Sequence, residues 1–227
     1  MNATSRHRLL APCMAAILGL AATSAPAAAY ELWFVGLYCA SEAQHSIGSD
    51  SDETFLVVTV YDNATGDILA PPRILPTDGD GQPTQWNDVD AGEFRDTAYR
   101  LWSGGERDLY IDIQTWEFDN HGVAAFRVLV DFTVGVGIGF ATANPFAGAA
   151  AGVVANEIGG RIFSQLDSGD HDFLGSNAIV IDAGDMAAWA THKHYNVQGG
   201  GTRIDFDFSA PTTGRGADYE IYFDISG

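Results

Sequence analysis

The chain has 227 residues, with 30 Asp and Glu against 11 Lys and Arg, and its formal net charge at pH 7 is −19. Such an acidic chain is repelled by nucleic acid and by bare anionic lipid, so we expect no nucleic-acid partner. At 46% hydrophobic residues, its composition supports a packed core.

Residues 1–29 have the features of a secretory signal peptide. Arg6 and Arg8 give a positively charged start, residues 9–22 are mostly apolar, and Ala27-Ala28-Ala29 is a small-residue cleavage site. The apolar stretch is too short and too interrupted for a membrane anchor. We therefore expect a secreted or periplasmic protein.

The remaining part, residues 30–227, is expected to be one domain of 198 residues. It carries all 30 acidic residues but only nine of the 11 basic ones, so its formal charge is −21. Cys39 is its single cysteine, which excludes an intramolecular disulfide. Stability must therefore come from a core or from bound metal. The sequence does not indicate an oligomeric state.

Eight stretches have the β-branched, aromatic or alternating character of strands. They are residues 30–39, 54–61, 68–75, 94–102, 108–116, 178–181, 202–208 and 217–225. The first is apolar enough to be buried on both faces, and Pro71 and Pro72 restrict the third to a sheet edge. Short strands with turn signals between them predict an all-β fold, an antiparallel sandwich of about eight strands.

The last two strands alternate clearly. In residues 202–208, Ile204, Phe206 and Phe208 share one face, and Arg203, Asp205 and Asp207 share the other. In residues 217–225, the core-facing positions are Tyr219, Ile221, Phe223 and Ile225.

Two segments read as irregular. Residues 77–92 form a long acidic loop, and its Asp78/Asp80 and Asp88/Asp90 pairs lack the glutamate spacing of an EF-hand, which favours a solvated loop. Residues 186–194 fit either a short helix or a loop.

Residues 123–166 interrupt the strand pattern. No charged residue occurs from Phe132 to Asn156, and Asn144-Pro145 is a turn signal in the middle, which predicts a hairpin of two arms. Glycines four apart and the Glu157/Arg161 spacing favour helical arms. An alternating run at residues 134–140 keeps a strand interpretation open.

This Gly/Ala-rich hairpin has two possible roles. Packing on the sandwich satisfies its small residues and is the favoured interpretation. The alternative is contact with a membrane or a protein partner through Phe140 and Phe146, although each arm is shorter than the ~20 residues of a spanning helix.

Acidic residues gather at three places that one end of a sandwich would bring together. A hard divalent cation takes six to eight oxygen ligands, mostly carboxylates and carbonyls of loops. We therefore predict a calcium site formed by Asp50, Asp52, Glu117, Asp119, Asp170 and Asp172.

These residues resemble the C2 domains, which are calcium-dependent β-sandwich modules. Ser51-Asp52 stands where that family has Ser-Asp-Pro-Tyr, and Glu117-Phe118-Asp119 with Asp172-Phe173-Leu174-Gly175 resembles its third metal loop, split by residues 123–166. The chain departs from the family pattern where Ser46 replaces an aspartate, where proline is absent after Asp52, and where Glu117 replaces an aspartate. The resemblance implies calcium binding and a membrane- or protein-facing loop end.

Three functions remain open at this stage. The favoured one is a secreted, non-catalytic calcium-binding module with a C2-like fold. The others are a structural or assembly protein that uses the hairpin without metal, and a metal-dependent hydrolase that uses the same acidic end. No nucleophile elbow or phosphate-binding loop is present, and His192 and His194 lack a third zinc ligand, so no catalytic residue is assigned.

Overall fold

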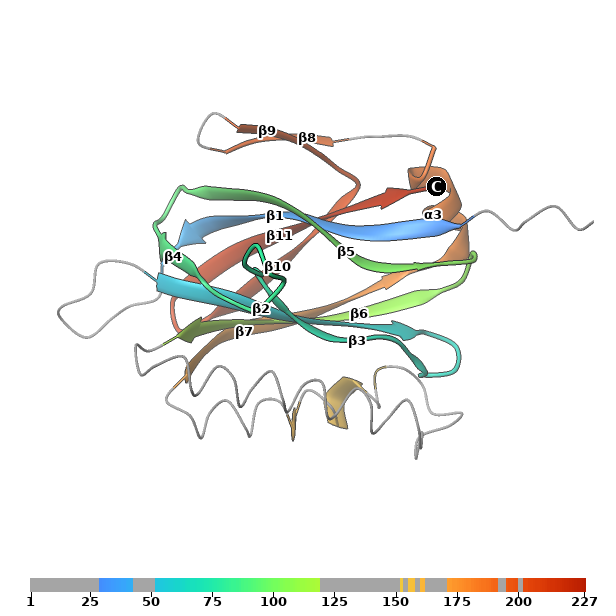
Figure 1. Ribbon diagram of the computed structural model, residues 1–227, viewed down its shortest axis with the longest axis horizontal. Helices are drawn as coiled ribbons and strands as arrows, with labels where there is room; N and C mark the ends of the chain where they lie inside the picture. Colours follow the sequence, from blue (N-terminus) through green and yellow to red (C-terminus); the bar gives the residue numbers. More distant parts are fainter. Residues whose placement is uncertain are drawn as a thin grey trace, which may run out of the picture.

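A computed structural model describes residues 29–42, 52–118, 152, 155–157, 160–161, 171–191, 195–199 and 202–227. Two antiparallel sheets face each other in a sandwich-like, all-β arrangement (Figure 1). The two faces that meet are lined by alternate residues of each strand, because successive side chains of a strand point to opposite sides.

Sheet A has the strand order β10-β11-β1-β5. Its strands are β10 (Phe208–Gly214), β11 (Ala217–Ser226), β1 (Tyr30–Ser41) and β5 (Phe94–Gly104). The first and last strands of the chain are therefore neighbours, with Glu31 opposite Ser226.

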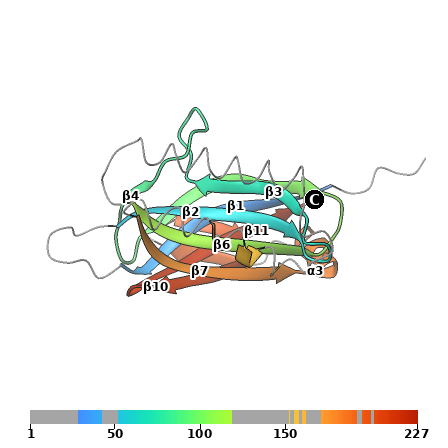
Figure 2. The same ribbon diagram turned by 90° about the horizontal axis from the view of Figure 1, so that it is seen from below.

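Sheet B has the order β3-β2-β6-β7, and Figure 2 shows these strands side by side. They are β3 (Ile68–Leu75), β2 (Asp52–Asp62), β6 (Leu109–Phe118) and β7 (His171–Ile181). A short strand, β4 (Trp86–Val89), pairs with the start of β2 beyond the point where β3 ends.

Three smaller elements complete the described chain. The helix α3 (Ala183–Trp189) follows β7, and Asp182 caps it by accepting a hydrogen bond from the Asp185 N–H. Strands β8 (Tyr195–Gly199) and β9 (Thr202–Phe206) form a separate two-stranded ribbon.

The core lies between the sheets. The core residues nearly inaccessible to solvent include Leu56, Val58 and Val60 of β2, Ile111 and Ile113 of β6, Leu32, Phe34 and Leu37 of β1, and Tyr219, Ile221 and Phe223 of β11. Burial of this apolar surface is the main stabilising term of the fold.

The two sheets meet along one side, where β7 runs beside β10. Oγ1 of Thr115 and Oγ1 of Thr212 are 2.7 Å apart, and Nδ2 of Asn177 donates to the Pro211 carbonyl at 2.7 Å. Gly214 lies so close to β7 that a Cβ there would come within 2.3 Å of the Leu174 carbonyl oxygen. Glycine at this position allows the close backbone approach.

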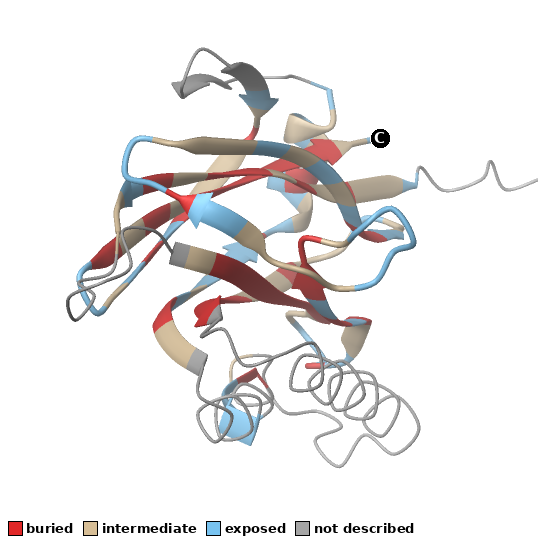
Figure 3. Cartoon of the chain, turned by 60° about the vertical axis from the view of Figure 1, so that its left-hand side comes forward, coloured by how far each residue is buried: buried red, intermediate tan, exposed pale blue. Residues whose placement is uncertain are grey.

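Sheet B is also buried on its outer face, over β2 and β6, and Figure 3 colours most of β2 as buried. Phe55, Tyr61 and Trp116 face away from the core yet are fully buried. Part of the cover belongs to the 123–166 segment: Ala155 is buried, and a Cβ on Gly152 would lie 3.8 Å from the Tyr110 ring. The strand buried on both faces is thus β2, whereas β1 is only half-buried on its second face.

Several sequence predictions are confirmed. The edge position of the Pro71-Pro72 strand is observed in β3, and the core-facing residues of β11 are the predicted four. Of the predicted helical hairpin, only residues 152, 155–157 and 160–161 are described; they have helical backbone, and Arg161 forms an ion pair with Glu157 at 2.9 Å, but the hairpin itself stays a prediction. The first arm and the tip of the predicted hairpin lie outside the described residues.

Other predictions are wrong in detail. The predicted strand at residues 202–208 is interrupted at Asp207, where the chain bends and the buried carboxylate accepts a hydrogen bond from the Ile225 N–H at 2.7 Å. This buried bond separates β9 from β10, which continues to Gly214. The loop at residues 77–92 contains β4, and β7 starts seven residues earlier than predicted, at His171.

Candidate functional site

The strand register brings three of the predicted acidic positions to one end of sheet B. Glu117 near the end of β6 is opposite Thr54 of β2 on one side and Asp172 of β7 on the other. Asp52 begins β2 two residues before Thr54. We call this the acidic end of the sandwich and define it by Asp52, Glu117 and Asp172.

The interior of the sandwich is polar at the acidic end. Glu117 is only 3% exposed, and it shares the inner face of sheet B with the buried Thr54 and Thr115. The hydroxyls of Thr54 and Tyr219 are 3.0 Å apart across the two sheets. The buried side chain of Glu117 therefore shares this end of the interior with hydroxyl-bearing side chains.

Asp172 lies opposite Glu117 on the same face and has a cationic partner. Nη1 of Arg215, in the β10–β11 turn, forms an ion pair with Oδ1 of Asp172. Like charges directly opposite each other destabilise an antiparallel pair, and the guanidinium of Arg215 offsets this repulsion. Both members of the pair are accessible, at 55% for Arg215 and 38% for Asp172.

The turn that carries Arg215 has an uncommon backbone. Gly214 pairs with Ala217, so the turn has two central residues, and both have positive φ, 49° at Arg215 and 88° at Gly216. Asparagine, aspartate or glycine is usual at the first of these positions, because the left-handed conformation costs other residues roughly 1–2 kcal/mol.

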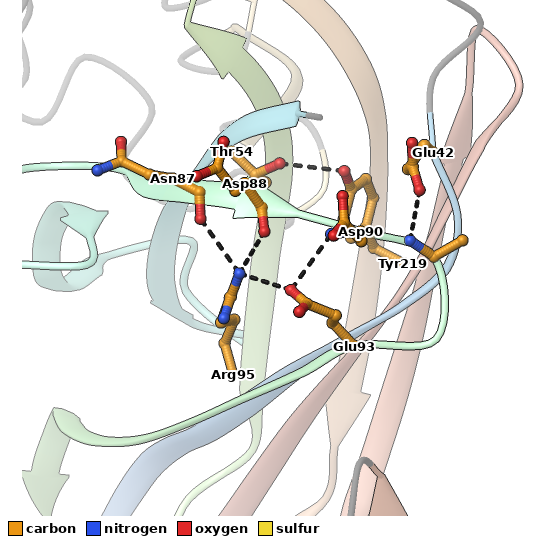
Figure 4. Close-up of polar contacts among 9 residues, drawn as sticks. Glu42, Thr54, Asn87, Asp88, Asp90, Glu93, Arg95 and Tyr219 are labelled. Atoms are coloured by element: carbon orange, nitrogen blue, oxygen red, sulfur yellow. Dashed lines mark hydrogen bonds and ion pairs between the residues drawn. The ribbon is translucent and has the colours of Figure 1, made fainter. Parts of the chain in front are cut away.

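A second arginine organises the neighbouring loop, as Figure 4 shows. Nη2 of Arg95 donates to the Asn87 carbonyl at 3.1 Å and to the Asp88 carbonyl, and it lies 2.5 Å from a Glu93 carboxylate oxygen. On the other side of the loop, Glu42 at the end of β1 accepts from the Ala91 N–H at 2.6 Å.

This loop is therefore held in place by Arg95 on one side and by Glu42 on the other. Asp78 has a similar local role, since its Oδ1 accepts from the N–H groups of Asp80 and Gln82 at 2.9 and 2.8 Å.

The predicted metal ligands are only partly described. Glu117 and Asp172 are placed with their side chains, and Asp52 is placed by its backbone. Asp50, Asp119 and Asp170 lie outside the described residues, as do Phe140 and Phe146. Within the described part of the chain, no group of three His, Cys, Asp or Glu side chains is arranged to hold a metal ion.

For calcium, the described residues thus supply two carboxylates on one inner face, which is a fragment of the six to eight oxygens required. The described helices include none that is long and apolar enough to cross a bilayer.

Sequence reasoning missed three charged groups. Arg215 and Arg95 lie beside the acidic end, and the Gly-Arg-Gly turn between two alternating strands was the available signal for the first. The third is Asp112, on the outer face of sheet B opposite Thr59, where burial raises the pKa of its carboxyl to about 7 although Gln114 donates a hydrogen bond to it.

No protein-family model, no curated protein and no solved structure matches this chain. The resemblance to C2 domains therefore rests on the residues quoted above.

Proposed function

We propose that this chain is a secreted or periplasmic, non-catalytic β-sandwich module of C2-like type that binds calcium at its acidic end. Through that end it would contact a membrane or a protein partner. The signal-like residues 1–29, the net charge of −19 and the acidic end support this proposal together.

One observation carries it. The antiparallel register puts Glu117 and Asp172 opposite each other on one inner face, next to the start of β2 with Asp52. Two carboxylates in this relation repel each other, so a cation bound between them would stabilise the fold. Three further acidic residues of the sequence, Asp50, Asp119 and Asp170, flank these strand ends.

A second candidate is favoured by the ion pair between Arg215 and Asp172. Here the acidic end is balanced by the protein's own arginines, and the chain is a structural or assembly protein that needs no metal. The two candidates differ in what calcium does to stability.

The test is thermal unfolding of the protein without residues 1–29, in chelator and in millimolar calcium. A calcium concentration 100-fold above the dissociation constant would stabilise the fold by about 2.7 kcal/mol, which raises the melting temperature by about 5–10 °C. Magnesium at the same concentration is the control for ionic strength, because it keeps its water and requires near-octahedral geometry.

Two variants locate the effect. Asp172→Asn should abolish the calcium-dependent shift, whereas Asp80→Asn, in the exposed β3–β4 loop, changes the charge equally and should retain it. Equal melting temperatures in chelator and calcium would reject the calcium proposal and favour the metal-free structural protein.

A further inference from the structure

Strand β5 is the open edge of sheet A. Among the described strands it pairs only with β1, so the backbone N–H and C=O groups on its other side have no strand partner within the described chain. The strand is 11 residues long and contains no proline. An edge of this kind is a template on which another strand can pair.

The other edges of the two sheets are obstructed. Strands β7 and β10 lie against each other, since a Cβ on Gly175 would come within 2.7 Å of the Thr213 backbone. At the remaining edge of sheet B, Pro71 and Pro72 remove two N–H groups from β3. Within the described sandwich, β5 is therefore the edge best able to accept a further strand.

The side chains at the centre of β5 divide between two faces. Tyr99 points inwards and packs against the core, and its hydroxyl accepts from the Thr77 N–H at 3.1 Å and donates to the Thr77 carbonyl at 3.0 Å. Asp96, Ala98 and Arg100 therefore line the outer face of sheet A, and all three are exposed. The anchored Tyr99 holds this row in place.

The charges of the row are symmetric about Ala98, because Asp96 is two residues before it and Arg100 is two residues after it. When two copies of β5 pair antiparallel with Ala98 opposite Ala98, Asp96 of each copy lies opposite Arg100 of the other. Pairing centred on Asp96 or on Arg100 would instead put like charges opposite each other, which is unfavourable. The charge pattern therefore favours the two-fold register centred on Ala98.

The existing contacts of this row leave room for a second copy. Nη1 of Arg100 is 2.7 Å from Oε1 of Glu31 on β1, and the Arg100 side chain remains 54% exposed. A guanidinium has five N–H donors, so it can also bind a carboxylate of another chain. Asp96 has no cationic partner among the described residues. Both charges are thus available across the edge.

We propose that β5 is a dimerisation edge, at which a second copy of this chain adds its own β5 antiparallel and joins the two A sheets into one continuous sheet. Its two-fold symmetry makes the contact between Asp96 and Arg100 occur twice. Glu117 and Asp172 belong to sheet B, so the dimer does not require the proposed calcium site.

Charge reversal at Asp96 tests the pairing, because general electrostatics and local pairing predict opposite results. Asp96→Arg brings the net charge two units closer to zero, which reduces the repulsion between two copies of charge −19. In the proposed dimer it places arginine opposite Arg100 twice, so association should weaken by on the order of 30-fold. Asp185→Arg makes the same change of charge at an exposed position of α3 and should not weaken association.

A mixture of two variants makes the test specific. Arg100→Asp should also weaken association, since it places carboxylates opposite each other. An equimolar mixture of Asp96→Arg and Arg100→Asp should form a mixed dimer, because both cross-strand pairs then join opposite charges again. Sedimentation velocity of purified protein expressed from the full chain, at about 1–200 μM, measures the association.

Weaker association of both single variants, with recovery in the mixture, supports the dimer. A wild type that stays monomeric over this range refutes it. So does a wild-type dimer that both variants retain, or a mixture of folded variants that stays monomeric, since the contact then lies elsewhere. If a charge reversal lowers the melting temperature, Asp96→Asn decides instead. It removes the charge at an exposed position with a side chain of the same size, and association should weaken about fivefold.

Discussion

Asp112 shows how a single residue can set the pH range in which this fold is stable. Its carboxyl lies on the covered outer face of sheet B, close to Tyr61, whose pKa burial also raises well above its usual value. Burial penalises the charged form of an acid, so Asp112 retains its proton up to about pH 7 in the folded protein. An unfolded aspartate loses its proton near pH 4.

The sign of the resulting pH dependence follows from proton binding. Between about pH 4 and pH 7 the folded state holds a proton that the unfolded state has lost, so Asp112 makes stability fall as pH rises through that range. Asp112→Asn should remove this decrease and raise the free energy of unfolding at pH 8 by on the order of 3 kcal/mol. Urea unfolding at pH 5 and pH 8 measures it.

Asp80→Asn is the matched control, since it removes the same charge from an exposed loop and should change the free energy of unfolding equally at both pH values. If Asp112→Asn is no more stable than the wild type at pH 8, the carboxyl is not desolvated in solution.

At the scale of elements, the side where β7 meets β10 holds the two sheets together through backbone contact. A side chain at Gly214 would strike the Leu174 carbonyl group, with its oxygen at 2.3 Å and its carbon at 2.9 Å, and backbone atoms cannot rotate away as a side chain can. Gly214→Ala should therefore cost about 1–3 kcal/mol of stability, the usual range for overpacking.

Gly79→Ala is the comparison, because a Cβ there meets nothing within 4 Å. Both substitutions stiffen the unfolded chain alike, so their difference isolates the contact between strands. Chemical unfolding of both variants measures it. A Gly214→Ala protein as stable as Gly79→Ala would show that β10 can move away from β7 at little cost.

The elements also show what a sequence pattern can and cannot predict. The period-two alternation of β11 and the prolines of β3 are local signals, so both strands were predicted correctly. Asp207 breaks its strand through a hydrogen bond to Ile225, eighteen residues away, and no local pattern contains that partner. Burial of Asp112 has the same origin, since it depends on what covers sheet B.

For the acidic end, the sequence could predict only that the ends of several strands, with their acidic residues, lie close together. Antiparallel pairing of β2, β6 and β7 places Asp52, Glu117 and Asp172 together once the strands are known. Their charge partner was not predictable, because Arg215 is 43 residues from Asp172 in the chain and belongs to the other sheet. The sequence predicted a site made of carboxylates alone, whereas in the structure one of them, Asp172, is paired with Arg215.

For the whole molecule, the dominant electrostatic quantity is the net charge of −19. Arg95, Arg100 and Arg215 each neutralise one carboxylate through an ion pair. However, the 30 Asp and Glu residues far outnumber the 11 Lys and Arg residues. A compact chain brings these charges closer together than an unfolded chain does, so self-repulsion opposes folding at pH 7.

Added salt should screen this repulsion and stabilise the fold, and a measurement near the isoelectric point serves as the control. Raising sodium chloride from 20 to 300 mM at pH 7 shortens the Debye length to below 10 Å, and we expect the melting temperature to rise by about 2–4 °C, equivalent to ~1 kcal/mol for a chain of this size. Near pH 4.3, the isoelectric point of the sequence, the net charge vanishes and the same salt should have little effect.

Exposed ion pairs such as Arg100–Glu31 weaken in salt. This acts in the opposite direction but contributes less than 1 kcal/mol for each pair. Calorimetric melting at the two pH values measures the effect of salt. A melting temperature that falls with salt at pH 7 would mean that the ion pairs outweigh the net charge. The acidic end would then be balanced more completely than Arg215 and Arg95 alone can explain.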